Sequence, residues 1–295
     1  MPNEDIDVVD ICLPPQMHKE AILLALDARK HVICEKPLVP SLADIDDIIA
    51  ACKVSSCHVM PVFQYRFGND LSILNTLIQR GVAGSALVAT IETHWNRDES
   101  YYAVPWRGKW STELGGAIVG HAIHAHDLLV QLLGPVASIQ AQLATRVNDI
   151  EVEDCAGVVF KMKNGALVTS SVTLGSASDQ SRLRLCFSHM TAQSSLSPYN
   201  PGAQPWTFKA RNNAKQSVID EIVMNHEPHR EGFARQFELA YEAFTHHGTT
   251  PVTLNDARLS LDIISGIYRS ARTDGVVSLP IVKENAEYRG WIPKL

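Results

Sequence analysis

One stretch near the N-terminus, residues 6–41, constrains the fold more than any other part of the chain. Two short apolar runs, at 8–13 and 31–34, are rich in β-branched residues and end abruptly at prolines or charged residues, which is typical of buried strands. The segment between them, 19–28, carries apolar residues at helical spacing. A strand, a helix and a strand within about thirty residues predict a βαβ unit with parallel strands.

The ends of these two strands predict where the functional site lies. Ligands of open parallel sheets bind beyond the carboxyl ends of the strands. The residues that fall there are Pro14, Pro15, His18, Glu35 and Lys36. The chemistry of the protein is therefore expected at this edge of the sheet.

The rest of the first half continues the same alternation. Ser41 is a suitable N-cap for a helix that runs to about residue 52. A third strand follows at 58–63, and another helix at 70–80 ends at a glycine. Residues 1–83 are therefore predicted to form a parallel α/β domain.

From residue 84 the hydrophobic period changes. Strand patterns recur with short turns and without intervening helices, which indicates an antiparallel sheet. The predicted strands span residues 86–95, 138–145, 155–162, 166–174 and 183–187. Helices are predicted over 117–133, 230–245 and 257–272, and loops over 96–113 and 194–213. Residues 84–295 are therefore predicted to be α+β, so that the fold class is α/β followed by α+β.

Charge and hydropathy exclude several classes of protein. The net charge of the 295 residues is −6, without a clustered basic face, which argues against a nucleic-acid partner. No run of eighteen apolar residues predicts a membrane span, and the first residues lack the pattern of a signal peptide. The sequence is therefore expected to encode a soluble, cytoplasmic protein.

The glycine turn that opens a dinucleotide-binding domain is absent from the sequence. That turn reads G-x-G-x-x-G between a strand and a helix, and the helix N-terminus holds the pyrophosphate. Residues 115–120 contain three glycines, but their spacing differs and they follow a loop.

Despite this absence, the motifs taken together resemble the Gfo/Idh/MocA family of oxidoreductases almost end to end. They are Asp7-Val8-Val9-Asp10-Ile11, Pro14-Pro15, His18, His31-Val32, Glu35-Lys36-Pro37, Gln64-Tyr65-Arg66-Phe67, Trp106-Arg107-Gly108, Gly115-Gly116, His124, Asp127 and Tyr268-Arg269-Ser270-Ala271-Arg272. The E-K-P triplet combined with Gly-Gly and the His-x-x-Asp helix is the specific part. The resemblance implies an incomplete Rossmann-type parallel sheet followed by a domain with an open, mostly antiparallel sheet.

The resemblance begins at the family's fourth strand. The segment with the glycine turn, and with the residue that selects NAD or NADP, has no counterpart here. The strand at 8–13 is then expected to be a bare edge, with unpaired backbone groups. Either the true start codon lies upstream of Met1, or the chain is truncated and its cofactor binding is impaired. The cost of an exposed edge strand favours the upstream start.

Two single positions also depart from the family pattern. The family commonly has glycine where Arg29 stands, so a positive φ at this residue would cost on the order of 1 kcal/mol. Many of its dehydrogenases place an aspartate four residues before the catalytic histidine, where this chain has Gly120. A branch of the family carries a histidine next to that position, as His121 does here.

Lys36 is the predicted acid-base group. Oxidising a secondary alcohol by hydride transfer to a nicotinamide requires a base for the hydroxyl proton. A lysine serves if partial burial beside the positively charged ring draws its pKa down from about 10.4. The resemblance implies that Lys36 contacts nicotinamide and substrate, that Glu35 orients it, and that the Lys36-Pro37 bond is cis. The alternative is a plain strand-to-helix turn with two solvated charges.

Three polar side chains form a stripe on the helix after the Gly-Gly pair. His121, His124 and Asp127 stand at i, i+3 and i+6. In the functional interpretation the catalytic set is Lys36, His124 and His121, and His124 hydrogen-bonds the reacting oxygen and shares its proton with Lys36. Zinc binding by the two histidines is the weaker alternative because no third or fourth ligand is placed, so no metal is assigned. His126, off the stripe, is given a structural role.

The loop before that helix offers recognition groups. Tyr102, Trp106 and Arg107 combine aromatic faces with a guanidinium, which suits a sugar or polyol. Arg66, Tyr102 and Asp127 are assigned to the substrate. The alternatives are an interface or packing loop for the aromatic residues and a surface cation for Arg66.

The cofactor assignment combines the strand ends with this loop. The cofactor-binding residues are predicted to be Pro14, Pro15, His18, Glu35, Lys36, Trp106 and Arg107. The alternative for the first three is a simple strand terminator and helix N-terminus.

These residues predict an NAD- or NADP-dependent oxidoreductase that acts on a sugar or cyclitol-like polyol. Two alternatives stay open: a redox-neutral enzyme that cleaves glycosides with a retained NAD, and a non-catalytic subunit that forms oligomers. A homodimer or homotetramer through the antiparallel sheet is expected.

Overall fold

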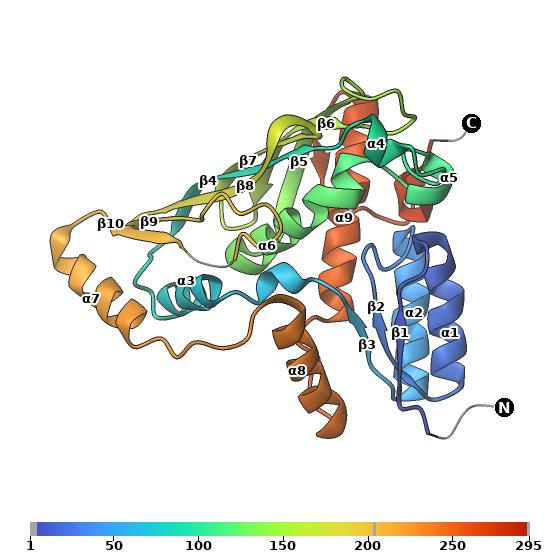
Figure 1. Cartoon of the computed structure of the whole chain (residues 1–295), viewed down its shortest axis with the longest axis horizontal. Coiled ribbons are helices and arrows are strands. Elements are labelled where there is room, and N and C mark those ends of the chain that lie inside the picture. Colours follow the sequence, from blue (N-terminus) through green and yellow to red (C-terminus); the bar gives the residue numbers. More distant parts are fainter. Residues whose placement is uncertain (1–4, 203–204, 294–295) are drawn as a thin grey trace.

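The protein is described by a computed structural model that covers residues 5–202 and 205–293. Figure 1 shows a small sheet with two helices at one end, a larger sheet at the other, and a long helix between the two sheets. The long helix is α9 (Leu254–Thr273), which packs against β5 (Val136–Ala144) of the larger sheet and β3 (Val59–Pro61) of the smaller one. The two sheets therefore share one helical layer.

The small sheet is parallel, as the sequence predicts. Within the described residues its order is β1-β2-β3, with β1 (Val8–Ile11) paired to β2 (His31–Cys34) and β2 paired to β3. Helix α1 (His18–Asp27) connects the first two strands, and α2 (Leu42–Ser55) packs beside it. The predicted βαβ unit is confirmed.

Local details of this half also follow the sequence. Ser41 caps α2, because its hydroxyl accepts a hydrogen bond from the Asp44 amide at 3.0 Å. Helix α3 (Asn69–Gln79) ends before Gly81, whose φ is +71°, and Arg29 has φ of +57° in the position where the family commonly has glycine. Among the described residues β1 pairs with β2 alone, so the predicted bare edge is confirmed.

The large sheet has the order β10-β9-β8-β4-β7-β6-β5-β11 in the described part of the chain. All neighbouring pairs are antiparallel except β4 and β7, which are parallel. Its further strands are β4 (Ala86–Asn96), β6 (Cys155–Met162), β7 (Leu167–Thr173), β8 (Gly175–Phe187), β9 (Met190–Gln193), β10 (Thr207–Ala210) and β11 (Val277–Ser278). Helices α6 (Ile123–Leu133) and α9 cover one face, which confirms the mostly antiparallel α+β half.

Several segments differ from the prediction. Strands β9 and β11 were not predicted, and β8 begins at Gly175, well before the predicted strand 183–187. Helix α7 (Asn213–Met224) was not predicted, and β10 lies inside the predicted loop 194–213. Helices α4 (Glu99–Tyr102) and α5 (Trp110–Glu113) interrupt the other predicted loop. The helix predicted over 117–133 begins with a π-helical segment, Ile118–Ala122, before α6. The late helix α8 (Gly232–Thr245) agrees with the prediction.

The core is one connected cluster that contains apolar residues of both sheets. The proposed division of the chain near residue 83 therefore stays a prediction. None of the helices in the described part of the chain is both long enough and apolar enough to cross a membrane.

Candidate functional site

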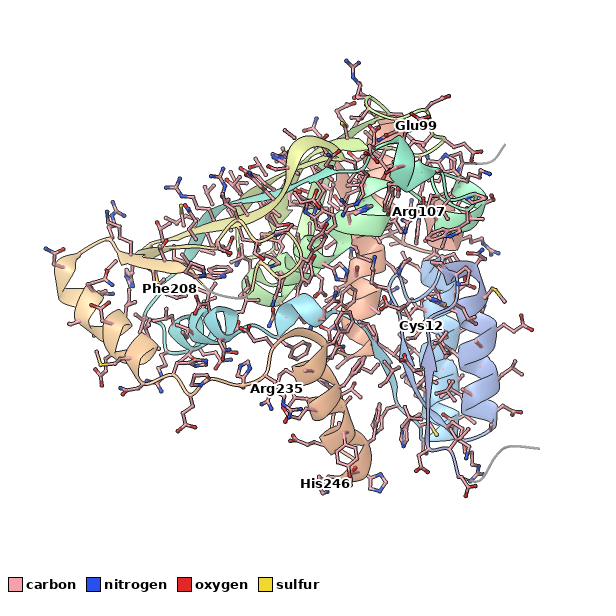
Figure 2. The ribbon with its side chains drawn as sticks, viewed as in Figure 1. Cys12, Glu99, Arg107, Phe208, Arg235 and His246 are labelled. Carbon is pink, nitrogen blue, oxygen red and sulfur yellow. The ribbon has the colours of Figure 1, made fainter. Side chains whose placement is uncertain are left out.

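A cavity of about 560 Å³ lies at the carboxyl ends of β1 and β2, where the sequence predicts the chemistry. We call it the strand-end cavity. Its walls contain five of the predicted site residues, Pro14, Pro15, Lys36, Trp106 and Arg107. Further lining residues that the sequence did not single out include Cys12, Tyr101, Thr112 and Glu113. Figure 2 shows Arg107 above Cys12, which directly follows β1.

Lys36 is held in the wall of this cavity by its backbone and by its side chain. The Lys36-Pro37 bond is cis, and the Lys36 amide donates a hydrogen bond to the Glu35 carboxylate at 3.1 Å. The Lys36 Nζ donates to the carbonyl oxygen of Gly120 at 2.7 Å. Burial lowers the pKa of Lys36, and the carboxylates of Glu35 and Glu113 partly offset that effect. A lysine in this state can act as a proton acceptor more readily than a solvated one.

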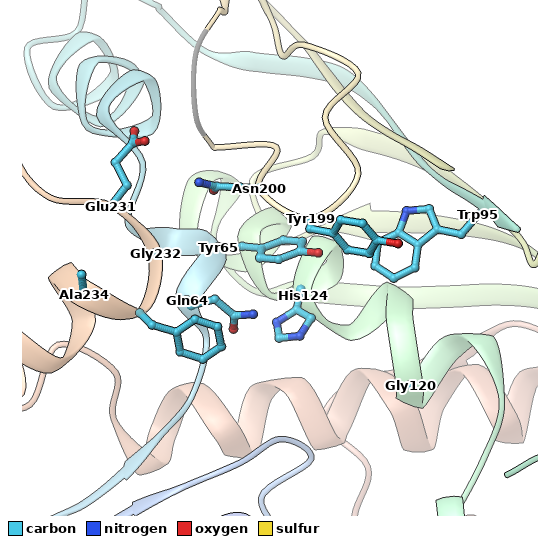
Figure 3. Close-up of a pocket in the computed structure, with 11 residues that line it drawn as sticks. Gln64, Tyr65, Trp95, Gly120, His124, Tyr199, Asn200, Glu231, Gly232 and Ala234 are labelled. Carbon is cyan, nitrogen blue, oxygen red and sulfur yellow. The ribbon is translucent and has the colours of Figure 1, made fainter. Parts of the chain in front are cut away.

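A second cavity, of about 610 Å³, adjoins the first at Gly120, which lines both. We call it the His124 cavity. Figure 3 shows His124 beneath Tyr65, with Gln64 beside it and with Tyr199 and Trp95 on one side. The Tyr65 and His124 rings stack at 4.5 Å between centroids. Lys36 and His124 therefore line two cavities that meet at one backbone position.

Both histidines of the predicted stripe are surrounded by protein and held neutral. Burial, followed by the charge of Lys36, lowers the pKa of His124 well below its usual value and that of His121 to about 3. The Nδ1 atom of each ring has no hydrogen-bond partner among the described residues. His121 packs edge-on against Trp95 at 5.1 Å and does not line either cavity. A catalytic role for His121 therefore stays a prediction.

The helix that carries these histidines is anchored by a buried carboxylate. Glu153 accepts hydrogen bonds from the amides of Gly116 and Ile118 at 3.0 to 3.1 Å and from the Tyr268 hydroxyl at 2.9 Å. A Cβ atom on Gly116 would lie 1.8 Å from the Glu153 carbonyl oxygen, so this position requires glycine. Glu153 thus sets the position of the π-helical segment and of the Gly120 carbonyl. Sequence reasoning did not identify it.

His18, predicted to contact the cofactor, is placed behind the strand-end cavity. The side chain is fully buried and lies outside the cavity lining. Its Nε2 lies 2.6 Å from the Leu13 carbonyl oxygen and its Nδ1 lies 3.1 Å from the Pro37 carbonyl oxygen. His18 therefore ties together the two strand ends that form the cavity floor.

Arg66 and Asp127, which are predicted to bind substrate, are hydrogen-bonded to each other. Two hydrogen bonds of 2.7 and 2.6 Å join the Arg66 guanidinium to the Asp127 carboxylate, and Asp256 lies 3.2 Å from the same guanidinium. Burial raises the pKa of Asp127 to about 6 despite the opposing effect of Arg66. Neither residue lines the two cavities. Their role in substrate binding stays a prediction, and their contacts point to a structural function.

Of the two adjacent tyrosines, Tyr101 reaches the strand-end cavity and Tyr102 does not. The Arg107 guanidinium lies over the Tyr101 ring at 3.8 Å and over the Trp106 ring at 4.5 Å. The Tyr102 ring packs edge-on against Tyr101 at 5.0 Å. Tyr102 therefore supports the wall of the cavity, and the substrate contact assigned to it stays a prediction.

The described residues contain no group of three or more histidine, cysteine or acidic side chains arranged to hold a metal ion. His126 is buried and its Nε2 lies 3.0 Å from the Ser170 hydroxyl. This contact agrees with the structural role predicted for His126.

Comparisons with known proteins connect this geometry to a family. A model described as an oxidoreductase family with an NAD-binding Rossmann fold matches residues 1–63. A model of the GFO/IDH/MocA C-terminal domain matches residues 73–193. Two models of one family thus match both sheets in the expected order.

Individual relatives are similar over part of their length. An uncharacterized oxidoreductase of Schizosaccharomyces pombe is 28% identical over 160 residues, which are 54% of this chain and 42% of the relative. Levoglucosan dehydrogenase of Pseudarthrobacter phenanthrenivorans is 32% identical over 145 residues, which are 48% of this chain and 37% of that protein. These curated relatives are therefore matched over less than half of their length.

A solved structure is similar over nearly the whole chain. The WlbA dehydrogenase of Chromobacterium violaceum, in complex with NADH and UDP-GlcNAcA, is 27% identical and has a TM-score of 0.82. The match covers 95% of this chain and 79% of that one. The order of the two sheets in this chain is thus the order found in a dehydrogenase.

Proposed function

The chain belongs to the GFO/IDH/MocA family of oxidoreductases, and from that membership we propose that it interconverts an alcohol and a carbonyl in a sugar or cyclitol-like polyol with NAD or NADP. The observation that carries the proposal is the position of Lys36. Its amine is fixed by the Gly120 carbonyl at the point where the strand-end cavity meets the His124 cavity. One cavity is thus available for a cofactor and the other for a substrate.

The strand-end cavity has the lining that a nicotinamide needs. Pro14, Pro15 and Val119 give it apolar walls, and Trp106 and Arg107 add an aromatic face and a cation that suits a phosphate. These residues, with Lys36, would hold the cofactor. The bound cofactor would supply a two-electron hydride acceptor or donor.

Lys36 would move the proton of the reaction. In the oxidation direction its amine takes the proton of the substrate hydroxyl, and in the reduction direction its ammonium returns a proton to the carbonyl oxygen. The Gly120 carbonyl occupies only one hydrogen-bonding position of Nζ, so the others can face the substrate. His124 is neutral and offers an unpartnered Nδ1 to a substrate hydroxyl.

The His124 cavity supports the choice of a sugar or polyol. Tyr65, Trp95 and Tyr199 give it aromatic walls that suit the apolar face of a sugar ring. The amide oxygens of Gln64 and Asn200 have no partner among the described residues, so both can accept hydrogen bonds from hydroxyl groups.

The proposed cofactor site is tested by titrating NADH and NADPH into the protein and following nicotinamide fluorescence. We expect saturable binding of at least one of them. Replacing Cys12 with tryptophan fills the strand-end cavity and should abolish that binding, whereas Val54→Trp, on the exposed surface of α2, should leave it unchanged. Binding of neither nucleotide by folded protein, or equal binding by both variants, would contradict the proposed site.

We also propose that the uncovered face of the large sheet forms an interface between copies of the chain. Val88, Val159 and Leu167 point out from this face and are each about half exposed, at 48, 49 and 51%. The strand register places them on the same side as the ion pair between Glu92 and Arg182. An apolar patch next to paired charges is typical of homo-oligomer interfaces.

Replacing Val159 with lysine tests this interface. The charge would have to be buried in the contact, so the oligomer should dissociate while the fold is kept. Analytical ultracentrifugation measures the change, and Val223→Lys on the exposed side of α7 is the matched control. A wild-type protein that sediments as a monomer would refute the interface.

A further inference from the structure

Glu113 is the acidic side chain that lines the strand-end cavity together with Lys36. It stands at the end of α5, and its carboxylate accepts a hydrogen bond from the Gly108 amide. The Arg107 guanidinium lies 3.8 Å from the same carboxylate. Among the described residues no other carboxylate lines this cavity.

The surroundings of Lys36 leave Glu113 as the carboxylate in its cavity that can take a proton. An amine that removes a proton from a substrate must lose it again before the next turnover. The group hydrogen-bonded to Nζ is the carbonyl of Gly120, which can orient the lysine but cannot accept the proton. Glu35 binds the backbone amide of Lys36 and lies outside the cavity lining.

The electrostatics agree with coupling between the two side chains. The charge of Glu113 raises the pKa of Lys36 against the effect of burial, and the charge of Lys36 lowers the pKa of Glu113. Burial is the larger influence on Glu113 and raises its pKa above the usual value of a glutamate. A carboxyl group with a raised pKa releases a proton more slowly and accepts one more readily near neutral pH.

We propose that Glu113 is the proton-relay partner of Lys36 and receives through the strand-end cavity the proton that the lysine takes from the substrate. Lys36 and Glu113 line the same cavity without a direct hydrogen bond or ion pair, so a water molecule in the cavity carries the proton between them. In the relay step an Nζ–H bond of the ammonium breaks as that water takes the proton, and the water gives a proton to the Glu113 carboxylate, where an O–H bond forms. The lysine returns to the neutral amine, and the carboxyl group then releases the proton to water. This assignment rests on the proposed function, and it makes Glu113 a positioning residue that acts through Lys36.

The coupling is tested without cofactor or substrate. The rate at which a neutral acylating reagent modifies Lys36 reports the fraction of free amine, and peptide mass spectrometry measures it as a function of pH. Glu113→Gln keeps an oxygen for the Gly108 amide but removes the charge. The Lys36 pKa should therefore fall, and the acylation rate below that pKa should rise measurably. Glu99→Gln, on the exposed surface of α4, is the matched control.

A charge restored at another position provides the second test. A Cβ atom on Gly120 would meet no other atom within 4 Å, and the Gly120 carbonyl binds Lys36, so this position has room for the first atom of an acidic side chain near the lysine. Adding Gly120→Asp to Glu113→Gln should return the Lys36 pKa toward the wild-type value, whereas Gly120→Asn, of the same size, should not. In turnover assays Glu113→Gln should lower kcat with little change in KM, and the aspartate should recover part of the loss.

An unchanged Lys36 pKa in Glu113→Gln overturns the relay, as does equal recovery by asparagine and aspartate. The proposed function is judged separately, because acylation requires no cofactor. If the Lys36 pKa shifts as expected but wild-type protein turns over no polyol, the coupling stands and the proposed function fails.

Discussion

Lys36→Met should lower kcat by about 10²- to 10⁴-fold and leave the fold unchanged, because that is the usual contribution of a positioned acid-base group. Methionine keeps most of the length of the side chain and removes the amine. The measurement is steady-state turnover of a polyol with NAD or NADP, with circular dichroism to check the fold. Lys53→Met, on the exposed part of α2, is the control and should keep full activity.

The pH dependence of kcat provides a second test of the role of Lys36. Activity in the oxidation direction requires neutral Lys36, so kcat should rise with pH as the amine loses its proton. Burial lowers the pKa of Lys36, so the midpoint of the rise should fall below the usual lysine value of about 10.4. A Lys36→Met enzyme that turns over at a near-normal rate, or a profile flat through this range, would remove Lys36 from its role.

Arg66→Met should destabilise the protein by about 3 to 5 kcal/mol, the usual cost of leaving one partner of a buried ion pair alone. The Asp127 side chain is 2% exposed, and its carboxylate takes both of its short hydrogen bonds from Arg66. Urea denaturation at pH 7 measures the change. Arg235→Met, which breaks an exposed pair with Glu238 on α8, should cost less than about 1 kcal/mol.

A double variant separates the structural function of the pair from the predicted substrate contact. Arg66→Met combined with Asp127→Leu removes both charges, so it should recover most of the lost stability. A substrate role predicts a different pattern. Arg66→Met would then keep the wild-type stability and raise KM for the polyol, and that result would refute the structural function.

Most strands and helices could be predicted because their signals are local. Strand β2 ends before Glu35 and β3 ends at Pro61. Ser41 begins a helix through its side-chain hydroxyl, and Gly81 follows the end of another through its positive φ. Helix α7, which packs against α3 and β10, was not predicted although its apolar residues follow a helical spacing as clearly as those of α1 and α2. The π-helical start of the helix after Gly116 was missed because the Glu153 carboxylate, which is distant in sequence, holds its first amides.

The candidate site was predictable at the strand ends and less so elsewhere. Pro14, Pro15 and Lys36 occur within a few residues of strand ends, and parallel topology brings such residues to one edge. Nothing local distinguishes Tyr101, which reaches the cavity, from Tyr102, which supports it. The buried ion pair between Arg66 and Asp127 was not predicted, because a charge partner 61 positions away leaves no pattern in the sequence.

The most direct test of the account is a crystal structure of the protein grown with millimolar NADH. Electron density for the nicotinamide ring should fill the strand-end cavity, in contact with Pro14 and with the side chain of Lys36. A ring bound at any other place on the molecule, with Lys36 still facing an empty cavity, would contradict the central claim that this lysine stands where cofactor and substrate meet.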